Sequence, residues 1–270
     1  MLALYITLGV VLFLLIAYIV LVFPGKKGDI EKFKSVKFAH RGLHNEERAE
    51  NSMSAFRAAV EAGYGIELDV RLSSDGQLVV FHDDTLDRVA GVSGRVDAYT
   101  ASELAQMKLS GTEDGVPLFS SVLEMVDGRV PLLVEIKEDA GNYAVSDATA
   151  QMLATYDGPY IVESFNPLSL GNIAKKLPGA TRGILSHRYY AYENYRKPLY
   201  MLLQLLLLNR VCKPAFVAYD HHHAGSVSLK VARLLGATTF AWTVRSEAEA
   251  AAAYKNGFDS IIFENFLPEK

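Results

Sequence analysis

The sequence contains a single cysteine, Cys212, and a single tryptophan among its 270 residues. One cysteine excludes an intramolecular disulfide framework and a zinc site built from several thiolates. An excess of basic residues is also lacking, because the formal net charge is −4, which argues against a nucleic-acid-binding protein that depends on a basic surface. Half of the residues are hydrophobic, so the chain is not disordered. Any bound metal must be held by carboxylate, histidine or carbonyl groups.

Charged residues are absent from the first 23 positions, where Thr7 is the most polar side chain. As a helix this segment spans about 34 Å, enough for the hydrocarbon core of a bilayer, which is about 30 Å thick. A signal peptide would need a basic region before the apolar stretch and a small-x-small cleavage pattern, and neither is present. The sequence therefore predicts a single transmembrane helix over residues 1–23, in preference to a signal peptide or an apolar core helix.

Basic residues predominate just after the predicted span, in a juxtamembrane linker over residues 24–34 and shortly beyond it. The positive-inside rule then predicts a single-pass protein of the cell membrane with its folded domain on the cytoplasmic side. The basic residues are Lys26, Lys27, Lys32, Lys34 and Lys37, against the acidic Asp29 and Glu31.

From residue 35 onward, short β-branched or apolar runs alternate with helical patterns. Strict alternation predicts a parallel sheet, and eight units in about 235 residues fit a closed (β/α)8 TIM barrel, which typically has about 250 residues. The expected strands cover residues 36–40, 65–70, 132–137, 160–165, 181–185, 215–220, 238–244 and 260–264. The expected helices cover residues 52–62, 120–127, 142–156, 167–177, 191–211, 226–235 and 247–256.

One hairpin interrupts this alternation after the second strand. Segments 65–72 and 77–82 both have strand patterns, yet only four residues separate them, so they must pair antiparallel. We therefore predict that residues 71–119 form a small insertion over the mouth of the barrel, where long loops carry function. The expected organisation is a transmembrane helix (1–23), a linker (24–34) and a barrel domain (35–270).

Three acidic residues are expected at the barrel mouth, because functional residues of such barrels gather at the C-terminal ends of the strands. Glu67 and Asp69 are two residues apart on the second strand, so both side chains point to the same face, and Glu135 lies on the third. Such carboxylates repel one another unless their pKa values rise or a hard divalent cation binds them. The alternative interpretation is a buried ion-pair network with no catalytic role.

Histidine and basic residues are expected at the same mouth. His40 and Arg41 end the first strand, Lys137 lies two residues after Glu135, and the hairpin returns His82 to the second strand. Two histidines can act as general base and general acid near neutral pH, and the two cations suit a phosphate. The combination suggests metal-assisted phosphodiester cleavage, although His82 alone could equally be a loop histidine.

A set of ordered motifs resembles the glycerophosphodiester phosphodiesterase family, and the N-terminal span makes the chain similar to a membrane-anchored member. The resemblance covers nearly everything from residue 35 on and implies a TIM barrel with an insertion after the second strand. The motifs are Ala39-His40-Arg41-Gly42, Glu50-Asn51-Ser52, Ala55-Phe56, Glu67-Leu68-Asp69-Val70, Asp75-Gly76, Val80-Phe81-His82-Asp83, Glu135-Ile136-Lys137, Ser164-Phe165-Asn166-Pro167 and Trp242-Thr243-Val244.

The resemblance also implies roles for individual residues and one divalent cation, Ca²⁺ or Mg²⁺. The implied reaction converts a glycerophosphodiester and water into glycerol 3-phosphate and an alcohol, through attack by the glycerol 2-hydroxyl and a cyclic phosphate. The implied roles are cation ligands (Glu67, Asp69, Glu135), the acid–base pair (His40, His82), phosphate binding (Arg41, Lys137), support of the site (Glu50, Asn51) and contact with the glycerol or its neighbour (Phe165, Trp242).

The sequence departs from the family pattern at two places near the predicted mouth. Arg245 follows Trp242-Thr243-Val244 where the family commonly has Asn, and Phe263-Glu264 stands where a Thr-Asp pair is usual. Both departures affect the expected substrate more than the expected chemistry. The run His221-His222-His223 follows the sixth strand at the same end, where it could contact substrate or metal or be solvated.

Two alternatives to a soluble glycerophosphodiester substrate remain open. One is a lysophospholipase D that acts on membrane lysolipids, and the other is a barrel that binds phospholipid headgroups without catalysis. Residues 200–208 are apolar nearly all round a helix and are flanked by basic residues, which suggests contact with membrane lipid. The alternatives are a homodimer interface or ordinary core.

Overall fold

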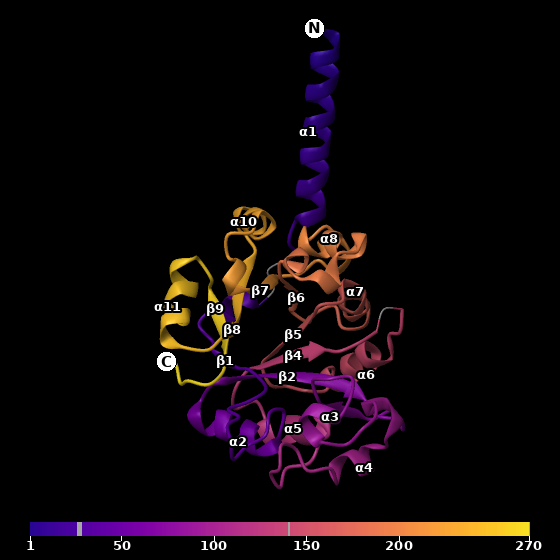
Figure 1. Cartoon of the computed structure of the whole chain (residues 1–270), viewed down its shortest axis with the longest axis vertical. Helices are drawn as coiled ribbons and strands as arrows, with labels where there is room; N and C mark the ends of the chain where they lie inside the picture. The colour runs from indigo at the N-terminus through magenta and orange to yellow at the C-terminus, as the bar shows by residue number, and fades with distance from the viewer. Residues whose placement is uncertain (26–28, 140, 270) are drawn as a thin grey trace.

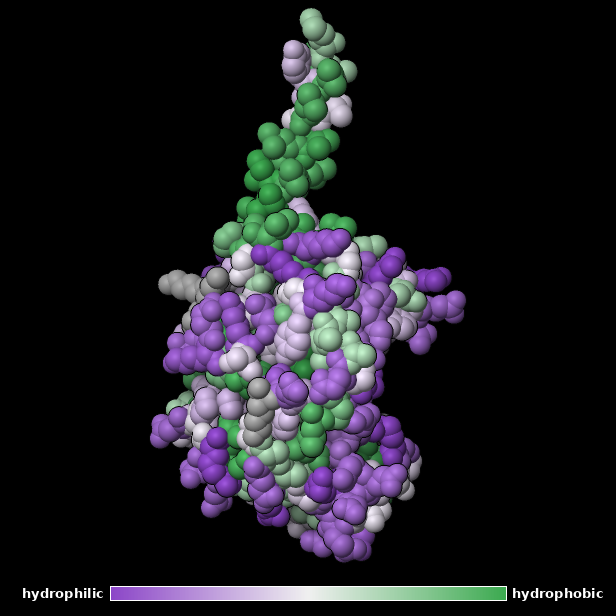
Figure 2. Space-filling model, turned by 90° about the vertical axis from the view of Figure 1, so that its left-hand side faces the viewer, coloured by the Kyte–Doolittle hydropathy of each residue, from purple (hydrophilic) through white to green (hydrophobic). Residues whose placement is uncertain are grey.

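The computed structural model describes residues 1–25, 29–139 and 141–269, and it consists of one long apolar helix and a barrel (Figure 1). Helix α1 (Leu2–Val22) projects from the barrel and is long and apolar enough to cross a membrane. On the face in Figure 2, α1 is mostly hydrophobic and the body below it mostly hydrophilic. Lys26 and Lys27, part of the predicted basic flank, lie outside the described residues.

The sheet forms a closed parallel barrel, as predicted for a TIM barrel. In the described residues it has nine strands, in the order β1-β9-β8-β7-β6-β5-β4-β2-β3, and pairing of β1 with β2 closes the ring. Of these nine strands, β3 alone lies outside the ring, antiparallel to β2, as the hairpin pattern predicted. The strands are β1 (Phe38–Ala39), β2 (Gly65–Leu72), β3 (Leu78–Val80), β4 (Leu132–Ile136), β5 (Tyr160–Ser164), β6 (Arg182–Ser186), β7 (Phe216–Asp220), β8 (Thr238–Val244) and β9 (Ser260–Phe263).

Helices cover the outside of the barrel, and α2, α7 and α11 begin at side-chain caps that the sequence provides. The Ser52 side chain accepts a hydrogen bond from the Ala55 backbone at the start of α2, and Gly63 ends this helix with a positive φ of 69°. Asn166 caps α7, and Pro167 occupies its first turn. The outer helices are α2 (Met53–Ala62), α5 (Phe119–Val126), α6 (Ala144–Leu153), α7 (Pro167–Lys176), α8 (Pro198–Gln204), α9 (Asn209–Cys212), α10 (Val227–Leu234) and α11 (Glu247–Lys255).

The inside of the barrel is divided between an apolar layer and the layers that hold the functional groups. Because side chains alternate along a strand, Leu133 and Glu135 of β4 point inward together, Leu133 nearer the N-terminal end. Leu133 belongs to an apolar cluster with Phe216 and with Ile30 and Phe33 of the short helix η1 (Ile30–Phe33). Residues in the predicted linker thus pack with the barrel interior, and the domain boundaries at residues 23 and 34 stay a prediction.

The insertion between β2 and α5 has a small core of its own. It contains β3, the short helices α3 (Asp87–Ala90), η2 (Val96–Ala98) and α4 (Ala101–Ala105), and a buried cluster that includes Phe81, Leu86 and Leu104. Thr100 and Glu103 form a capping box that starts α4. This local core gives the chain segment that returns His82 to the barrel a fixed position.

The expectation of one helix over residues 191–211 was wrong. The segment contains η3 (Tyr189–Ala191), η4 (Glu193–Tyr195), α8 and α9 instead. Pro198 starts a new helix because it cannot continue a preceding one, and Leu206, at φ 57°, lies outside helical geometry. Because α8 ends at Gln204, no continuous helix forms over residues 200–208. Leu206 is buried in the core, whereas Leu202 faces outward.

The end of α1 packs against the barrel. Val22 is fully buried in the same cluster as Leu206, and its backbone oxygen accepts a hydrogen bond from Asn209 Nδ2 at 3.2 Å. The Gly25 backbone N–H donates to the Pro214 oxygen at 2.8 Å. The segment between β6 and β7, which contains α8 and α9, therefore lies at the base of α1 (Figure 1).

Candidate active site

Three carboxylates meet inside the barrel, as the spacing of the acids predicted. Glu67 and Asp69 lie on β2, and the parallel register places Asp69 beside Glu135 of β4. All three side chains are buried, and one oxygen from each lies within 4.8 Å of those of the other two. A buried group of three oxygens at this spacing is suited to a hard divalent cation.

The electrostatics of these carboxylates support the same interpretation. Burial and the charges of Asp69 and Glu135 raise the pKa of Glu67 well above its usual value. Burial also raises the pKa of Glu135 to about 7, although Lys137 opposes the shift. Asp69 behaves differently: burial would raise its pKa, but the charges of Lys137, His82 and Arg41 hold it well below the usual range. Ionising all three acids thus requires more positive charge than the neighbouring side chains supply.

The two predicted phosphate-binding cations lie against this acid cluster. Lys137 Nζ is 2.6 Å from Glu135 Oε1 and 3.1 Å from Asp69 Oδ1. Arg41 Nε lies 3.6 Å from Asp69 Oδ2, and the Arg41 backbone N–H donates to Glu67 Oε2 at 2.8 Å. Arg41 has a positive φ of 56°, a conformation uncommon for arginine.

The predicted supporting residues hold the same groups in place. Glu50 accepts a hydrogen bond from Arg41 Nη1 at 2.7 Å, and Asn51 Nδ2 donates to Asp69 Oδ2 at 2.8 Å. Arg88 of α3, which the sequence did not indicate, bridges Glu50 and Asp83 at 2.7 Å each. Through Arg88 the insertion is tied to the barrel mouth.

His82 is held at the mouth by two contacts. Its Nδ1 lies 2.6 Å from Asp83 Oδ1, and its backbone oxygen accepts two hydrogen bonds from the Arg71 guanidinium, at 2.8 and 3.0 Å. Burial lowers the pKa of His82 to about 4, with Lys137 adding to the shift and Asp69 opposing it. The ring is therefore neutral near pH 7, and because the carboxylate can only accept, its proton is on Nδ1.

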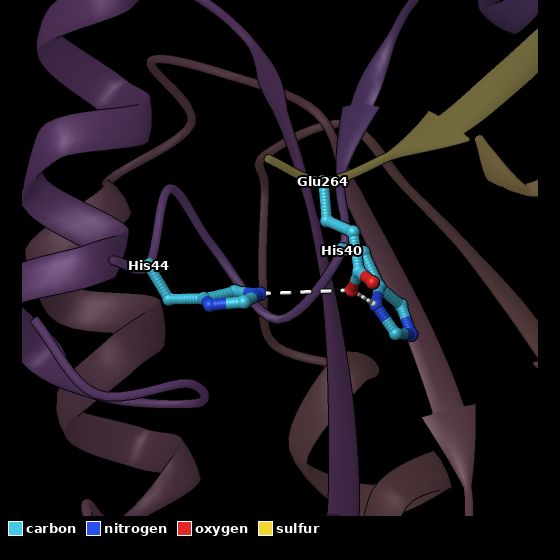
Figure 3. A group of neighbouring side chains, drawn as sticks. All are labelled: His40, His44 and Glu264. Carbon is cyan, nitrogen blue, oxygen red and sulfur yellow. Dashed lines mark hydrogen bonds and ion pairs between the residues drawn. The ribbon is translucent and has the colours of Figure 1, made fainter. Parts of the chain in front are cut away.

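His40 has a carboxylate partner as well, one to which the sequence patterns assigned no role. His40 Nδ1 lies 2.6 Å from Glu264 Oε2, and His44 Nε2 lies 3.7 Å from the same oxygen (Figure 3). Arg245 Nε donates to the other oxygen, Glu264 Oε1, at 2.6 Å. The two departures from the family pattern, Arg245 and Glu264, thus contact each other beside His40. Burial lowers the pKa of His40, and its hydrogen bond to Glu264 opposes that shift.

Glu163 of β5 is a fourth inward carboxylate that the sequence analysis missed. The register places it beside Glu135, it is buried, and its Oε2 has no hydrogen-bond partner among the described residues. Burial and the charges of Glu135 and Glu67 raise its pKa well above the usual value. The signal was present in the sequence, since Glu163 and Phe165 are two residues apart, as are Glu135 and Lys137.

The aromatic residues predicted to contact the glycerol lie together at the mouth. The Phe165 and Trp242 rings are 5.5 Å apart in a T-shaped arrangement, and Lys137 Nζ is 6.0 Å from the centre of the Phe165 ring. Of the described side-chain atoms, Trp242 Nε1 is one of those that are buried without a hydrogen-bond partner. The pair thus borders Lys137, one of the two residues predicted to bind phosphate.

The histidine run after β7 does not contact the acid cluster. It forms the short helix η5 (His221–His223), in which His222 Nδ1 and His223 Nδ1 bond to Asp220 at 2.9 and 2.8 Å. His221 Nε2 lies 3.6 Å from Glu249 Oε2. These three histidines therefore have acidic partners, Asp220 and Glu249, other than the three carboxylates of the acid cluster.

Comparisons with known proteins agree with this geometry. The model of the "Glycerophosphoryl diester phosphodiesterase family" matches residues 40–267. A glycerophosphodiester phosphodiesterase of Caldanaerobacter subterraneus subsp. tengcongensis is 28% identical over 250 residues, which are 86% of this chain and 95% of that protein. Lysophospholipase D GDPD1 of Homo sapiens is 35% identical over 135 residues, 50% of this chain and 41% of that protein. A solved structure of an Oleispira antarctica phosphodiesterase, in complex with the product sn-glycerol-3-phosphate, is similar to this chain with a TM-score of 0.72 and 23% sequence identity. The match covers 86% of this chain and 94% of the Oleispira chain, and it shows the fold.

Proposed function

The chain belongs to the glycerophosphoryl diester phosphodiesterase family and is a glycerophosphodiester phosphodiesterase, and on that basis we propose that it hydrolyses its substrate with one divalent cation and two histidines. The products are glycerol 3-phosphate and an alcohol. The observation that carries the proposal is the group of Glu67, Asp69 and Glu135, with one oxygen from each within 4.8 Å of the others. The product-bound Oleispira antarctica structure supports the substrate class.

The residues present fit Ca²⁺ or Mg²⁺. The donors are all carboxylate oxygens, which hard cations prefer, and burial holds the pKa values of Glu67 and Glu135 above their usual range until positive charge arrives. When bound, the cation supplies Lewis-acid stabilisation of negative charge on a phosphoryl oxygen. Glu67, Asp69 and Glu135 are the residues that would hold it.

Arg41 and Lys137 bind the remaining phosphoryl oxygens in this proposal. Both have ion-pair partners among the acids, which fix their positions before substrate arrives. Their charges lie where negative charge grows as the phosphorus accepts a fifth oxygen, so they stabilise the transition state more than the ground state. Glu50 and Asn51 keep Arg41 and Asp69 oriented, and Phe165 and Trp242 contact the glycerol or its neighbour.

The two histidines move the protons. Each binds a carboxylate through Nδ1, so each ring presents Nε2 for proton transfer. One histidine, in its neutral form, removes the proton of the glycerol 2-hydroxyl through Nε2 as that oxygen bonds to phosphorus. The other, in its doubly protonated form, gives the proton on its Nε2 to the alcohol oxygen as the bond between that oxygen and phosphorus breaks. Water then opens the cyclic phosphate with the roles reversed.

Glu264→Ala should lower kcat about 10- to 100-fold with a smaller effect on KM, because it removes the group that orients His40. The limb of the pH profile of kcat that reports ionisation of His40 should also move to lower pH. Burial lowers the pKa of His40 and the hydrogen bond to Glu264 opposes this shift, so loss of that bond lowers the pKa further. Steady-state kinetics across pH would measure both effects.

Glu264→Gln is the matched control for this prediction, since its amide oxygen can still accept from His40 Nδ1. It should recover part of the lost kcat. A pH profile identical in Glu264→Ala and the unsubstituted protein would show that Glu264 does not position His40.

The proposed reaction can be tested with purified protein and a panel of glycerophosphodiesters and lysolipids. The assay measures the released alcohol together with glycerol 3-phosphate or, for a lysolipid, acylated glycerol 3-phosphate. Activity should disappear in EDTA and return with Ca²⁺ or Mg²⁺. Binding of the panel without turnover under every metal condition would instead favour a headgroup-binding barrel. Retention of both histidines and all three acids argues against that alternative.

A lysophospholipase D is the second candidate, and two observations favour it. Half of the chain is similar to the human lysophospholipase D GDPD1. Helix α1 would also keep the barrel beside a bilayer, where lysolipids reside. The two candidates share the same catalytic groups and differ only in whether the glycerol carries an acyl chain.

We further propose that α1 anchors the protein in the cell membrane with the barrel on the cytoplasmic side. The helix is 21 residues long, and its apolar window is almost wholly exposed to the surroundings. The basic residues that follow it support the orientation. Protease protection of a tag fused to the C-terminus would test the orientation in intact cells.

Removing residues 2–20 should release a folded, active barrel from the membrane, whereas removal through Phe23 should destabilise it. Val22 is buried among core residues and its oxygen is bonded to Asn209, so the longer deletion opens a cavity at the base of α1. Loss of a buried valine typically costs about 1–3 kcal/mol of unfolding free energy. Thermal denaturation of the two truncated proteins would compare them, and equal stability would contradict a structural role of Val22.

A further inference from the structure

An apolar pocket of about 400 Å³ opens beside the catalytic mouth. This volume lies within the range of small-molecule sites, which is about 300–1,000 Å³. Its walls come from the ends of β4, β5 and β6 and from α8, and most of the lining is leucine or aromatic. The lining includes Phe165, His187, Tyr200, Leu199, Leu203 and Leu208.

The inner end of this pocket adjoins the phosphate-binding cations. Phe165 lines the pocket, and its ring centre is 6.0 Å from Lys137 Nζ. His187, also in the lining, lies 6.2 Å from both Phe165 and Trp242, measured between ring centroids. A molecule whose phosphate contacts Lys137 can therefore extend directly past Phe165 into the pocket.

One wall of the pocket is a packed group of aromatic rings. Tyr200 stacks on Tyr189 with centroids 5.4 Å apart and meets Tyr195 at 4.8 Å, and His187 lies 4.0 Å from Tyr189. Aromatic contacts of this kind fix the ring positions, so the pocket is largely formed before a ligand enters. The wall offers apolar ring surface along its length.

The outer end of the pocket lies toward the base of α1. Leu199 and Leu203 belong to α8, in the segment that lies at the base of α1 (Figure 1), and Leu208 immediately precedes α9, which contacts α1. Leu199 is 54% exposed at the rim, where an isolated soluble protein would leave it in water. If α1 spans a bilayer, this rim faces the lipid surface, and the pocket joins that surface to the active site.

We propose that this pocket binds the acyl chain of a lysoglycerophospholipid whose phosphodiester lies at Arg41 and Lys137. The inference rests on the proposed function and deepens it by assigning the substrate class. Free glycerol or a small alcohol would leave the leucines in contact with water, whereas an acyl chain covers them. The position of the pocket between the catalytic mouth and the membrane helix fits a substrate that enters from the bilayer.

The test measures kcat/KM of the full-length protein for glycerophosphocholine and for monomeric octanoyl, decanoyl and lauroyl lysophosphatidylcholine. Each methylene that enters the pocket should raise kcat/KM by up to about fourfold, equivalent to about 0.8 kcal/mol. Leu203→Trp fills the pocket and should remove most of the dependence on chain length, without a comparable loss for glycerophosphocholine. Leu199→Gln changes a residue at the exposed rim, where the substitution should not disturb folding. It should also weaken the dependence of kcat/KM on acyl-chain length.

Leu202→Trp is the matched control, because Leu202 lies on the same helix but is absent from the pocket lining. It should retain the full dependence on chain length. Equal kcat/KM for all chain lengths, with glycerophosphocholine hydrolysed normally, would overturn this inference and leave the proposed function standing. An equal loss for glycerophosphocholine in Leu203→Trp would show that the pocket takes the alcohol, which also overturns it. Absence of turnover with every substrate and metal would overturn the proposed function itself.

Discussion

Glu67→Gln should lower kcat/KM for glycerophosphodiesters by at least about 10³-fold, because it replaces one of the three carboxylate ligands of the proposed cation with a neutral amide. The loss corresponds to several kcal/mol of transition-state stabilisation. Asp69→Asn should act in the same way. Steady-state kinetics at a series of Ca²⁺ and Mg²⁺ concentrations, with product identification, would measure the effect. Undiminished turnover of Glu67→Gln in EDTA would end the metal hypothesis.

The fold of the Glu67→Gln variant should survive, which separates lost chemistry from lost structure. Burial and the neighbouring acids already disfavour the charged form of Glu67, as its raised pKa indicates, so a neutral amide relieves repulsion when no cation is present. Thermal denaturation in EDTA should show the variant at least as stable as the unsubstituted protein. Glu163→Gln provides a matched control, because Glu163 is also buried and inward-facing but lies outside the group of three. It should keep its activation by metal.

His40→Ala and His82→Ala should each lower kcat by about 10²- to 10⁴-fold, the contribution of a positioned acid or base. Each ring holds a carboxylate at Nδ1 and so presents Nε2 to the reacting groups. The double variant should lose far less than the product of the two single losses, since the pair acts as a unit. Pre-steady-state kinetics with a good leaving group would separate the first step from hydrolysis of the cyclic phosphate.

His44→Ala is the matched control for the histidine variants. His44 lies near the same carboxylate, with Nε2 3.7 Å from Glu264, but it has no proposed part in proton transfer. Its kcat should stay close to that of the unsubstituted protein. Near-normal kcat in either His40→Ala or His82→Ala would remove that histidine from the mechanism.

Local sequence patterns were sufficient to predict the barrel and most of the acid cluster. Eight alternating strands and helices commonly close into one architecture, the (β/α)8 barrel. The two-residue period of a strand then determines which side chains share its inner face. Glu67 and Asp69 could therefore be placed together from their spacing alone, and the short turn after β2 required an antiparallel return that brings His82 back. Each of these features depends on residues close together in the chain, which is why the sequence reveals it.

Contacts between distant segments depend on the three-dimensional arrangement and could not be predicted in this way. Glu264 reaches His40 across 224 positions of sequence, and nothing in either local pattern shows that the two side chains will lie 2.6 Å apart. The register between β4 and β5 likewise placed Glu163 beside Glu135.

The segment between β6 and β7 shows the same limit for packing. Leucines of this one segment lie in three different environments: Leu206 is buried in the core, Leu202 faces outward, and Leu203 lines the pocket. Composition states how apolar a segment is, whereas burial depends on which surfaces other elements bring against it. Val22 illustrates this at the end of α1, since a residue within an apparently independent span is buried in the same cluster as Leu206 and accepts a hydrogen bond from Asn209. Hydrophobic patterning thus determined the fold, and packing between remote elements decided the pocket and the partners of the catalytic groups.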